Sequence, residues 1–309
     1  MFKRVGICFA ITTLVILSFL VFPYAKAANE TSISISPLIF DLSANPGDTV
    51  TNELLIRNSG AEPTVVSVEA LDFVASGEEG EINLTDSQST YSLASWIELD
   101  SNQFTLKGGE QTKVKFSIRV PFNAEPGGHY ASVYVHLSPT LENASSGSGV
   151  GQKIGSLILM KVAGTTKEGA EAETFKTTKS VYENGPVNFN IRIKNTGSVH
   201  VKPKGIIAIT DIFGKKVADV AVEQKNILPG AVRHTTATWE KTPKFGKYTA
   251  TLLSYYGSDN KLLTTATTFW IIPWKTFAVI AAVIILLIVL IWLGRGRLKN
   301  AGKALLNKK

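Results

Sequence analysis

Apolar residues occupy every second position in several segments of the central part of the chain. In segments 114–120 and 187–193, Val, Phe and Ile alternate with Lys, Asn, Ser and Arg. A period of two places one set of side chains in a core and the other in water, which is typical of a half-buried antiparallel strand. Because residues 28–274 show no sustained helical periodicity, we predict that this region is all-β.

Turn signals rich in Asn, Pro and Gly separate the expected strands. Each half of this region has a strand that ends in Asn-x-Gly, then a Gly-containing turn, and then a Gly-x-Tyr strand. The matching pairs are 54–60 with 191–197, 106–109 with 228–230, and 128–130 with 246–248. This repeated order predicts two tandem immunoglobulin-like β-sandwiches that arose by duplication.

A stretch of small and polar residues marks the boundary between the two sandwiches. Residues 165–173 contain Thr, Lys, Gly, Ala and Glu without apolar alternation. The Ser/Gly-rich segment 145–149 resembles a linker as well. We interpret it as a hairpin loop, because the apolar segment 154–162 supplies a strand that the first sandwich needs.

The N-terminal segment has the features of a secretory signal peptide. Two cationic residues precede a mostly apolar run over residues 5–22, and Ala25 and Ala27 form a small-residue cleavage pattern. We predict cleavage after Ala27. The alternative is an uncleaved N-terminal anchor, because the apolar run approaches the length that spans a bilayer. The only cysteine, Cys8, lies in this run, so cleavage leaves a mature chain without disulfides.

A second membrane segment is expected near the C-terminus. Residues 277–293 contain no charge, and all charged residues after them are basic. This pattern predicts a transmembrane helix with a cytoplasmic C-terminus. The expected anchors at the membrane interface are Trp270, Trp274, Trp292, Arg295 and Arg297. The basic tail either lies along the inner leaflet as an amphipathic element or serves only as a stop-transfer signal.

Charge is distributed unevenly along the chain. The formal net charge is +7, but residues 28–274 hold 22 basic and 25 acidic residues, so no nucleic-acid partner is expected. Residues 28–166 carry 7 basic and 16 acidic residues, and residues 167–274 carry 15 and 9. The first domain is therefore acidic and the second basic. Either the basic domain faces anionic lipids or wall polymers, or the opposite charges help the two domains to dock.

Patterns that support catalysis or metal binding are missing from the sequence. It has no Gly-x-Ser-x-Gly elbow, no phosphate-binding loop and no His-x-x-x-His, so we expect no enzyme, no metal and no cofactor. His129 and His136 should point to opposite faces of one strand. Segment 78–81, Glu-Glu-Gly-Glu, is expected to be a solvated hairpin tip. Trp96 is the one candidate ligand-binding residue: its ring either stacks on a sugar or belongs to the core.

Short motifs of the first half, taken together, carry a resemblance to a known family. They are Ser36-Pro37, Asn45-Pro46-Gly47, Ser95-Trp96-Ile97, 106–110, 114–121 and 126–130. In this order they resemble the WxL-interacting surface proteins of Gram-positive-type bacteria. The resemblance implies an architecture of signal peptide, two immunoglobulin-like domains, transmembrane helix and basic tail. It also implies that the first domain binds peptidoglycan and the second binds partner surface proteins or host ligands.

The expected organisation follows from these segments. It comprises a signal peptide (1–27), a first sandwich (28–166), a second sandwich (167–270), a transmembrane helix (271–293) and a basic cytoplasmic tail (294–309). We expect a single-pass cell-membrane protein with extracellular sandwiches that binds peptidoglycan, partner surface proteins or both, as a scaffold. The alternative is an accessory or sensor subunit of a membrane complex, recruited through its helix and tail.

Overall fold

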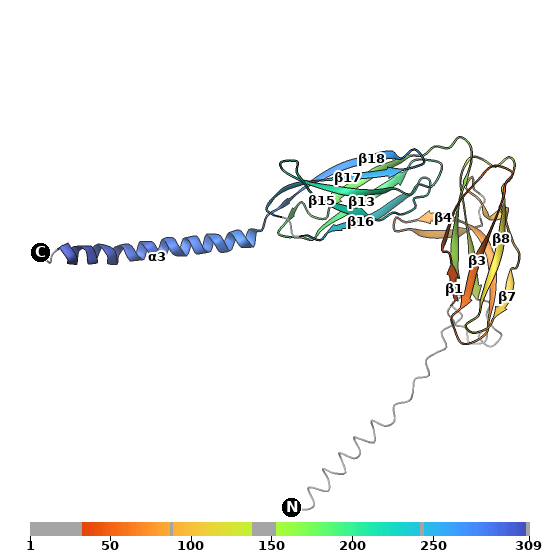
Figure 1. The fold of residues 1–309 in the computed structure, drawn as a ribbon, viewed down its shortest axis with the longest axis horizontal. Helices are drawn as coiled ribbons and strands as arrows, with labels where there is room; N and C mark the ends of the chain where they lie inside the picture. Colours follow the sequence, from red (N-terminus) through yellow and green to blue (C-terminus); the bar gives the residue numbers. More distant parts are fainter. Residues whose placement is uncertain (1–32, 87–88, 138–152, 242–243, 307–309) are drawn as a thin grey trace, which may run out of the picture.

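The chain folds into two β-sandwiches followed by one long helix (Figure 1). The computed structural model describes residues 33–86, 89–137, 153–241 and 244–306. Within these ranges the sandwiches form an L, and the helix leaves the second sandwich at the end far from the first (Figure 1). The predicted fold class is therefore confirmed. The expected signal peptide, its cleavage site at Ala27 and the segment 145–149 lie outside the described residues.

The first sandwich packs two sheets face to face. Its elements are β1 (Ile33–Ser36), β2 (Ile39–Ala44), β3 (Thr49–Asn58), β4 (Thr64–Ser76), β5 (Glu81–Thr85), the 3-10 turn η1 (Ala94–Trp96), β6 (Ile97–Leu99), β7 (Gln103–Leu106), β8 (Gln111–Arg119), β9 (Gly127–Leu137) and β10 (Lys153–Val162). One sheet has the order β1-β3-β8-β6 and the other β2-β10-β9-β4-β5, with β7 also paired to β4. As predicted, the segment 154–162 is a strand of this sandwich.

The second sandwich repeats this topology. Its strands are β11 (Ala170–Thr177), β12 (Val181–Tyr182), β13 (Val187–Asn195), β14 (Lys204–Asp211), β15 (Lys216–Val222), β16 (Val232–Trp239), β17 (Gly246–Tyr256) and β18 (Lys261–Ile271). The sheet orders are β11-β13-β16 and β12-β18-β17-β14-β15. The parallel pair β12–β18 corresponds to the parallel pair β2–β10. The two halves therefore share one strand plan, as a duplication predicts.

Both cores follow the alternation seen in the sequence. Phe116 on β8 and Phe189 on β13 are fully buried at the centres of their sandwiches, and their apolar neighbours two residues away are buried too. The charged residues between them on β8 stay exposed. Burying side chains of this size contributes roughly 1.5–3 kcal/mol each, so packing can hold these cores without a disulfide.

A buried asparagine closes the same turn in both sandwiches. Asn58 and Asn195 are fully buried, and each accepts a hydrogen bond at its side-chain oxygen from the glycine two residues later. Each side-chain amide donates to two backbone carbonyls at 2.7–3.2 Å, those of Glu62 and Leu106 for Asn58 and those of Val199 and Ile227 for Asn195. The predicted match between the two Asn-x-Gly motifs is therefore also a match in structure.

The third expected match is out of register by one residue. Gly127 and Gly246 begin β9 and β17 with positive φ. Two residues later come His129 and Tyr248, and each ring bonds the backbone carbonyl four residues before it. His129 is therefore the counterpart of Tyr248. Tyr130, which the sequence comparison aligned with Tyr248, points to the opposite face of its sheet, because a shift of one residue exchanges the faces of a strand.

The C-terminal helix α3 (Trp274–Leu306) begins three residues later than the predicted boundary at residue 271. Ile271 still belongs to β18, and Pro273 lies between the strand and the helix. Proline is not tolerated in the interior of a helix, so the helix begins only after it. The span Trp274–Leu293 is long and apolar enough to cross a membrane, and none of it is buried by protein. The helix continues beyond this span into the basic tail.

Candidate functional site

The most elaborate polar structure in the described chain lies where the two sandwiches meet. The outer face of the sheet that contains β4, β9 and β10 carries an apolar cluster of Phe73, Tyr130 and Leu159, and Leu228 of the second sandwich packs on it. A backbone hydrogen bond from Gly128 N–H to the carbonyl of Ser198, at 2.9 Å, joins the domains directly. We call this region the junction.

One edge of the junction is a latch formed by the β4–β5 hairpin tip, residues 77–80. Glu78 accepts two hydrogen bonds from the Arg192 guanidinium on β13, at 2.7 and 2.5 Å. The backbone carbonyl of Glu78 accepts the N–H of His234 on the edge strand β16, at 2.8 Å. The Arg192 hydrogen bond lowers the pKa of Glu78, and the pKa of Arg192 rises in turn. The tip adds backbone pairing to an exposed sheet edge.

The next two residues of the tip complete the latch. Glu79 Oε1 lies 2.6 Å from Nδ1 of His234. Gly80 has φ +100, which is strained for other residues, and a Cβ at this position would lie 1.7 Å from the Arg233 guanidinium, so a larger residue would require Arg233 to move. The predicted hairpin tip is therefore present, and Glu79, Gly80 and Glu81 are exposed to solvent as expected. The sequence did not indicate that Glu78 and Glu79 also bind partners on the second sandwich.

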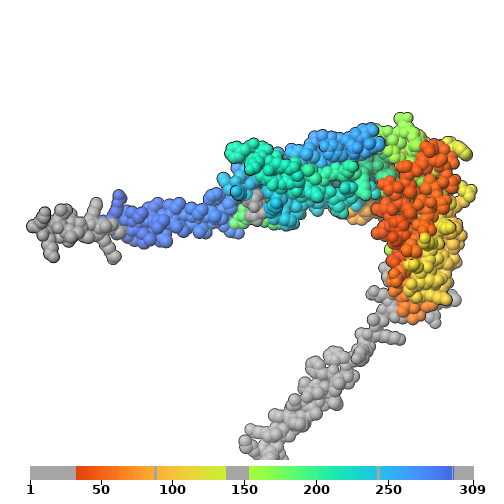
Figure 2. Space-filling view, viewed as in Figure 1, coloured from red at the N-terminus to blue at the C-terminus, as the bar shows by residue number. Residues whose placement is uncertain are grey.

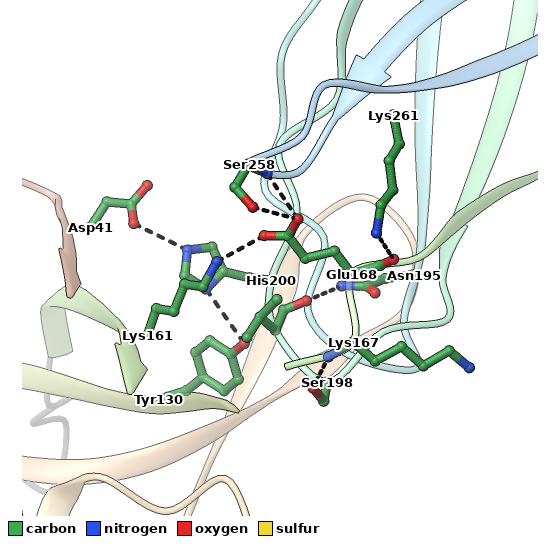
Figure 3. Close-up of polar contacts among 11 residues, drawn as sticks. Asp41, Tyr130, Lys161, Lys167, Glu168, Asn195, Ser198, His200, Ser258 and Lys261 are labelled. Carbon is green, nitrogen blue, oxygen red and sulfur yellow. Dashed lines mark hydrogen bonds and ion pairs between the residues drawn. The ribbon is translucent and has the colours of Figure 1, made fainter. Parts of the chain in front are cut away.

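The opposite edge of the junction is a hinge of charged and aromatic groups (Figure 3). His200 Nε2 lies 3.1 Å from the Asp41 carboxylate on β2, and its Nδ1 lies 3.5 Å from the Tyr130 hydroxyl. The His200 side chain is only 8% exposed. Burial lowers its pKa, and Asp41 offsets only part of that effect. Burial also raises the pKa of Tyr130. Neutral His200 therefore fits this contact.

A glutamate in the connecting segment ties three parts of the hinge together (Figure 3). Glu168 bonds Lys161 of the first sandwich at 2.8 Å, and it accepts the N–H of Ser258 from the β17–β18 turn at 2.8 Å. Burial disfavours its charge, but the bonds from Lys161 and Ser258 outweigh this effect and lower its pKa. The Glu168 backbone carbonyl also accepts from Lys261 at 3.3 Å. The linker is therefore held in one conformation.

Between the latch and the hinge lies a cavity of about 280 Å³. Its lining residues come from both sandwiches: Ile39, Phe73, Ala75, Gly77, Gly80, Glu81, Ile82, Leu157 and Leu159 from the first, and Lys202, Gln224, Lys225, Asn226, Ile227, Leu228, Ala231, Val232 and Arg233 from the second. The first sandwich supplies a mainly apolar wall and the second a wall with three cations. The volume is near the lower limit of roughly 300–1,000 Å³ for small-molecule sites.

Two polar atoms at the cavity are buried without a partner in the described part of the chain. They are Oδ1 of Asn226, an acceptor, and Nε of Arg233, a donor. Both atoms are closed off from solvent, including any solvent in the cavity, so an occupant would meet the three cations of the lining rather than these two atoms. A carboxylate suits such cations, and the apolar wall would cover a short aliphatic side chain. The cavity therefore suits one or two residues of a peptide.

The residues singled out by the sequence lie away from this cavity. Trp96 in η1 is partly buried against the core of the first sandwich, with its ring 4.5 Å from that of His129. His129 faces the same core, whereas His136 stacks beside Tyr134 on the outer face, so the predicted opposite orientation is confirmed. Among the described residues, no group of His, Cys, Asp and Glu is arranged to hold a metal ion.

The predicted membrane-interface residues lie at the far end of the second sandwich and on the helix. Trp270 is the second-last residue of β18, Trp274 begins α3 and Trp292 lies near the end of the apolar span, and all three are exposed. Arg295 follows on the same helix and is exposed, and Arg297 lies on the helix as well. The opposite net charges of the two halves had indicated docking of the domains as one of two interpretations, but the sequence did not identify the residues of the junction.

The chain has been compared with known proteins. No protein-family model matches it, and no curated protein matches it either. Solved structures are similar in fold. A chain of a chaperone–tip adhesin complex of CFA/I fimbriae biogenesis is 12% identical over 77% of this chain and 98% of that chain, with a TM-score of 0.40. The class 5 fimbriae chaperone CfaA is 14% identical over 77% and 99%, with a TM-score of 0.40.

The E. coli chaperone DraB is a further similar structure. It is 14% identical over 78% of this chain and 95% of that chain, with a TM-score of 0.34. At these identities and TM-scores the likeness concerns the arrangement of strands and carries no argument about function. We therefore derive the function from the junction.

Proposed function

We propose that this protein is a membrane-anchored binding or scaffold protein of the cell surface that takes a carboxylate-bearing peptide into the cavity at the junction. The observation that supports this proposal is the cavity at the junction, which has an apolar wall from the first sandwich and three cations from the second.

Two sources of such a peptide are compatible with the resemblance to WxL-interacting proteins. The peptide stems of peptidoglycan carry amides and carboxylates, and so does an extended segment of a partner surface protein. In both cases the transmembrane helix would tie the bound material to the membrane. The basic C-terminal residues support a cytoplasmic tail. In the proposed topology both sandwiches lie outside the cell.

The test is retention of the soluble exterior, residues 28–273, which keeps all of β18, on purified peptidoglycan sacculi, with and without their stem peptides removed by an amidase. The variant Lys202→Gln removes a cation that lines the cavity, and the matched control Lys204→Gln removes an exposed cation that does not. We expect Lys202→Gln to weaken retention about tenfold, because a charge-assisted hydrogen bond contributes about 1.5–3 kcal/mol.

The possible outcomes separate the alternatives. Loss of retention on stripped sacculi supports peptide recognition, whereas unchanged retention shows that the glycan is bound instead. Equal effects of the two lysine variants would contradict the assignment to the cavity. If the sacculi retain no protein, a protein partner is sought by crosslinking in cells. In that experiment, loss of partners when the helix is replaced by an unrelated one would favour the accessory-subunit alternative.

A further inference from the structure

Large apolar side chains are exposed at the end of the second sandwich from which α3 leaves. Ile212 and Phe213, at the tip of the β14–β15 hairpin, are 65% and 90% exposed. Phe245, in the loop before β17, is 59% exposed. Exposed apolar groups that cluster in this way mark an interaction surface, and no described residue covers them.

The strand register places these groups at one end of the domain. Asp211, the last residue of β14, is opposite Tyr248 near the start of β17. Gly246, which begins β17, is opposite Ile271, the last residue of β18 before the helix. The β14–β15 tip, the loop before β17 and the helix start therefore share one end. In Figure 2 the teal atoms of the β14–β15 region project at this end beside the blue helix.

The β14–β15 tip is a preformed turn. The Asp211 carboxylate accepts the backbone N–H groups of both Phe213 and Lys215, at 2.9 Å each. The backbone of Asp211 also bonds Gly214 and Lys215, at 3.0 and 2.9 Å. These four bonds hold Ile212 and Phe213 outward without support from any other element. The hydrogen-bonded turn therefore presents these apolar side chains in a fixed backbone conformation, and little conformational entropy is lost when they bind a partner.

The start of the helix is fixed to the same end of the sandwich. Ile272 donates to the carbonyl of Tyr182 at 2.8 Å, and Lys275 forms an ion pair with Glu183 at 2.9 Å. The rings of Phe245 and Phe277 meet edge to face, with centroids 5.4 Å apart. If the span Trp274–Leu293 crosses the bilayer, these contacts leave the end of the sandwich facing the lipid surface that the helix enters.

Charge at this end suits an anionic surface. Exposed cations surround the tip and the neighbouring loop: Lys215, Lys216, Lys241 and Lys244. The acidic groups of this end are Asp211, Glu183, Asp219 and Glu240. Asp211 is used by the turn, Glu183 pairs with Lys275 and Asp219 pairs with Lys216. Cations beside exposed aromatic residues are typical of protein surfaces that rest on lipid headgroups.

We propose that this end of the second sandwich docks on the outer leaflet, with Ile212 and Phe213 inserted at the headgroup level and the surrounding lysines close to lipid phosphates. Trp270 and Trp274 lie on the same side and complete an aromatic belt around the helix entry. The domain then rests on the membrane at two points, the helix and the hairpin tip. This surface is separate from the cavity at the junction, so the lipid contact rests on the membrane anchoring of the proposed function but not on peptide binding in the cavity.

The test uses the full chain in lipid nanodiscs that contain phosphatidylglycerol. In a Cys8→Ser background, Phe213→Cys and Phe122→Cys each introduce one labelling site for an environment-sensitive fluorophore. The two positions are matched, because both phenylalanines are 90% exposed and neither supports the core. Phe122 lies in the first sandwich, away from the helix. We expect a blue-shifted emission at position 213 that brominated lipids quench, and emission typical of water at position 122.

Two further arms complete the design. In nanodiscs of phosphatidylcholine alone, weaker quenching at position 213 would support the role of the lysines. The variant Ile212→Asp, combined with the label at 213, should remove the blue shift and the quenching, because a charge at the tip is unfavourable in the interface. Equal, water-like emission at positions 213 and 122 in anionic nanodiscs would overturn the proposal.

Discussion

At the scale of single residues, the buried asparagines explain why a two-residue sequence match persists in structure. Asn58 and Asn195 each end a strand, and their side chains satisfy two backbone carbonyls and one N–H of the turn that follows. A backbone group buried without a partner is unfavourable, so each asparagine replaces the bonds that the chain loses where the strand ends. The residue is therefore structural, although it is polar and lies in a turn.

Replacement of Asn58 by alanine should destabilise the first sandwich by about 3 kcal/mol, because a buried group left without its hydrogen bond costs about 1–3 kcal/mol. Urea unfolding of the soluble exterior measures this change. Asn123→Ala, at an exposed asparagine of the same sandwich, serves as the matched control and should leave stability within about 0.5 kcal/mol. Similar midpoints for the two variants would contradict the structural role of Asn58.

At the scale of elements, the β4–β5 hairpin is the component that joins the sandwiches most specifically. Its tip bonds β16 through the backbone and β13 through Glu78, so one hairpin reaches two strands of the other domain. The glycine at position 80 permits this approach, because the Arg233 guanidinium occupies the space that a side chain would need.

Gly80→Ala should therefore release the latch. We expect the backbone N–H of His234, which donates to Glu78, to exchange with deuterium about tenfold faster, since alanine at positive φ costs about 1–2 kcal/mol and its Cβ displaces Arg233. Gly109→Ala is the control, because its φ of +76 imposes similar backbone strain while no atom lies within 4 Å. Unchanged protection of His234 in Gly80→Ala would rule out the latch.

The local alternation of apolar and polar residues predicted most strands, but not the contacts between the two sandwiches. The alternation around Phe116 and Phe189 gave the strands and their buried faces, because burial on one face is a local constraint that each strand must satisfy. The partner of Glu78 is 114 residues away in sequence, and nothing near position 78 specifies Arg192. The register of Tyr130 failed for a related reason: Gly-Gly at positions 127 and 128 allows two alignments, and only packing selects one.

The charge contrast between the two halves left two interpretations open, and the structure favours domain docking for part of it. An ion pair crosses the junction from Glu78 to Arg192, and a hydrogen bond joins Asp41 to His200. The remaining exposed lysines lie largely at the membrane end, where the proposed lipid contact would use them. Acidic and basic groups therefore pair at the junction end of the second sandwich, and the lysines at the opposite end would contact lipid.

At the scale of the whole molecule, the junction should open on acidification. Docking lowers the pKa of His200 below its ordinary value of 6.5, so the undocked state binds a proton more readily and gains population as the pH falls below about 6.5. The pKa values of Glu78 and Glu168 are also lowered, from 4.5. Their contributions are present above that pH and are lost as the pH falls further.

Small-angle scattering of the soluble exterior measures this opening as an increase in the radius of gyration between pH 7 and pH 4. In His200→Gln, which keeps a neutral hydrogen-bonding side chain, we expect the change near pH 6.5 to disappear while the change below pH 4.5 stays. An identical pH curve for the variant and the parent protein would show that His200 does not control the junction.

The direction of β18 has a mechanical consequence. The second sandwich begins at the junction with β11, and β18 ends at Ile271, three residues before α3 begins. Under the proposed function, tension between a bound ligand and the membrane would run lengthwise along the strands. Hydrogen bonds between antiparallel strands are perpendicular to that direction, so the eleven-residue pairing of β17 with β18 is loaded in shear, all rungs together. A tether built in this way resists being pulled apart far better than one peeled open bond by bond.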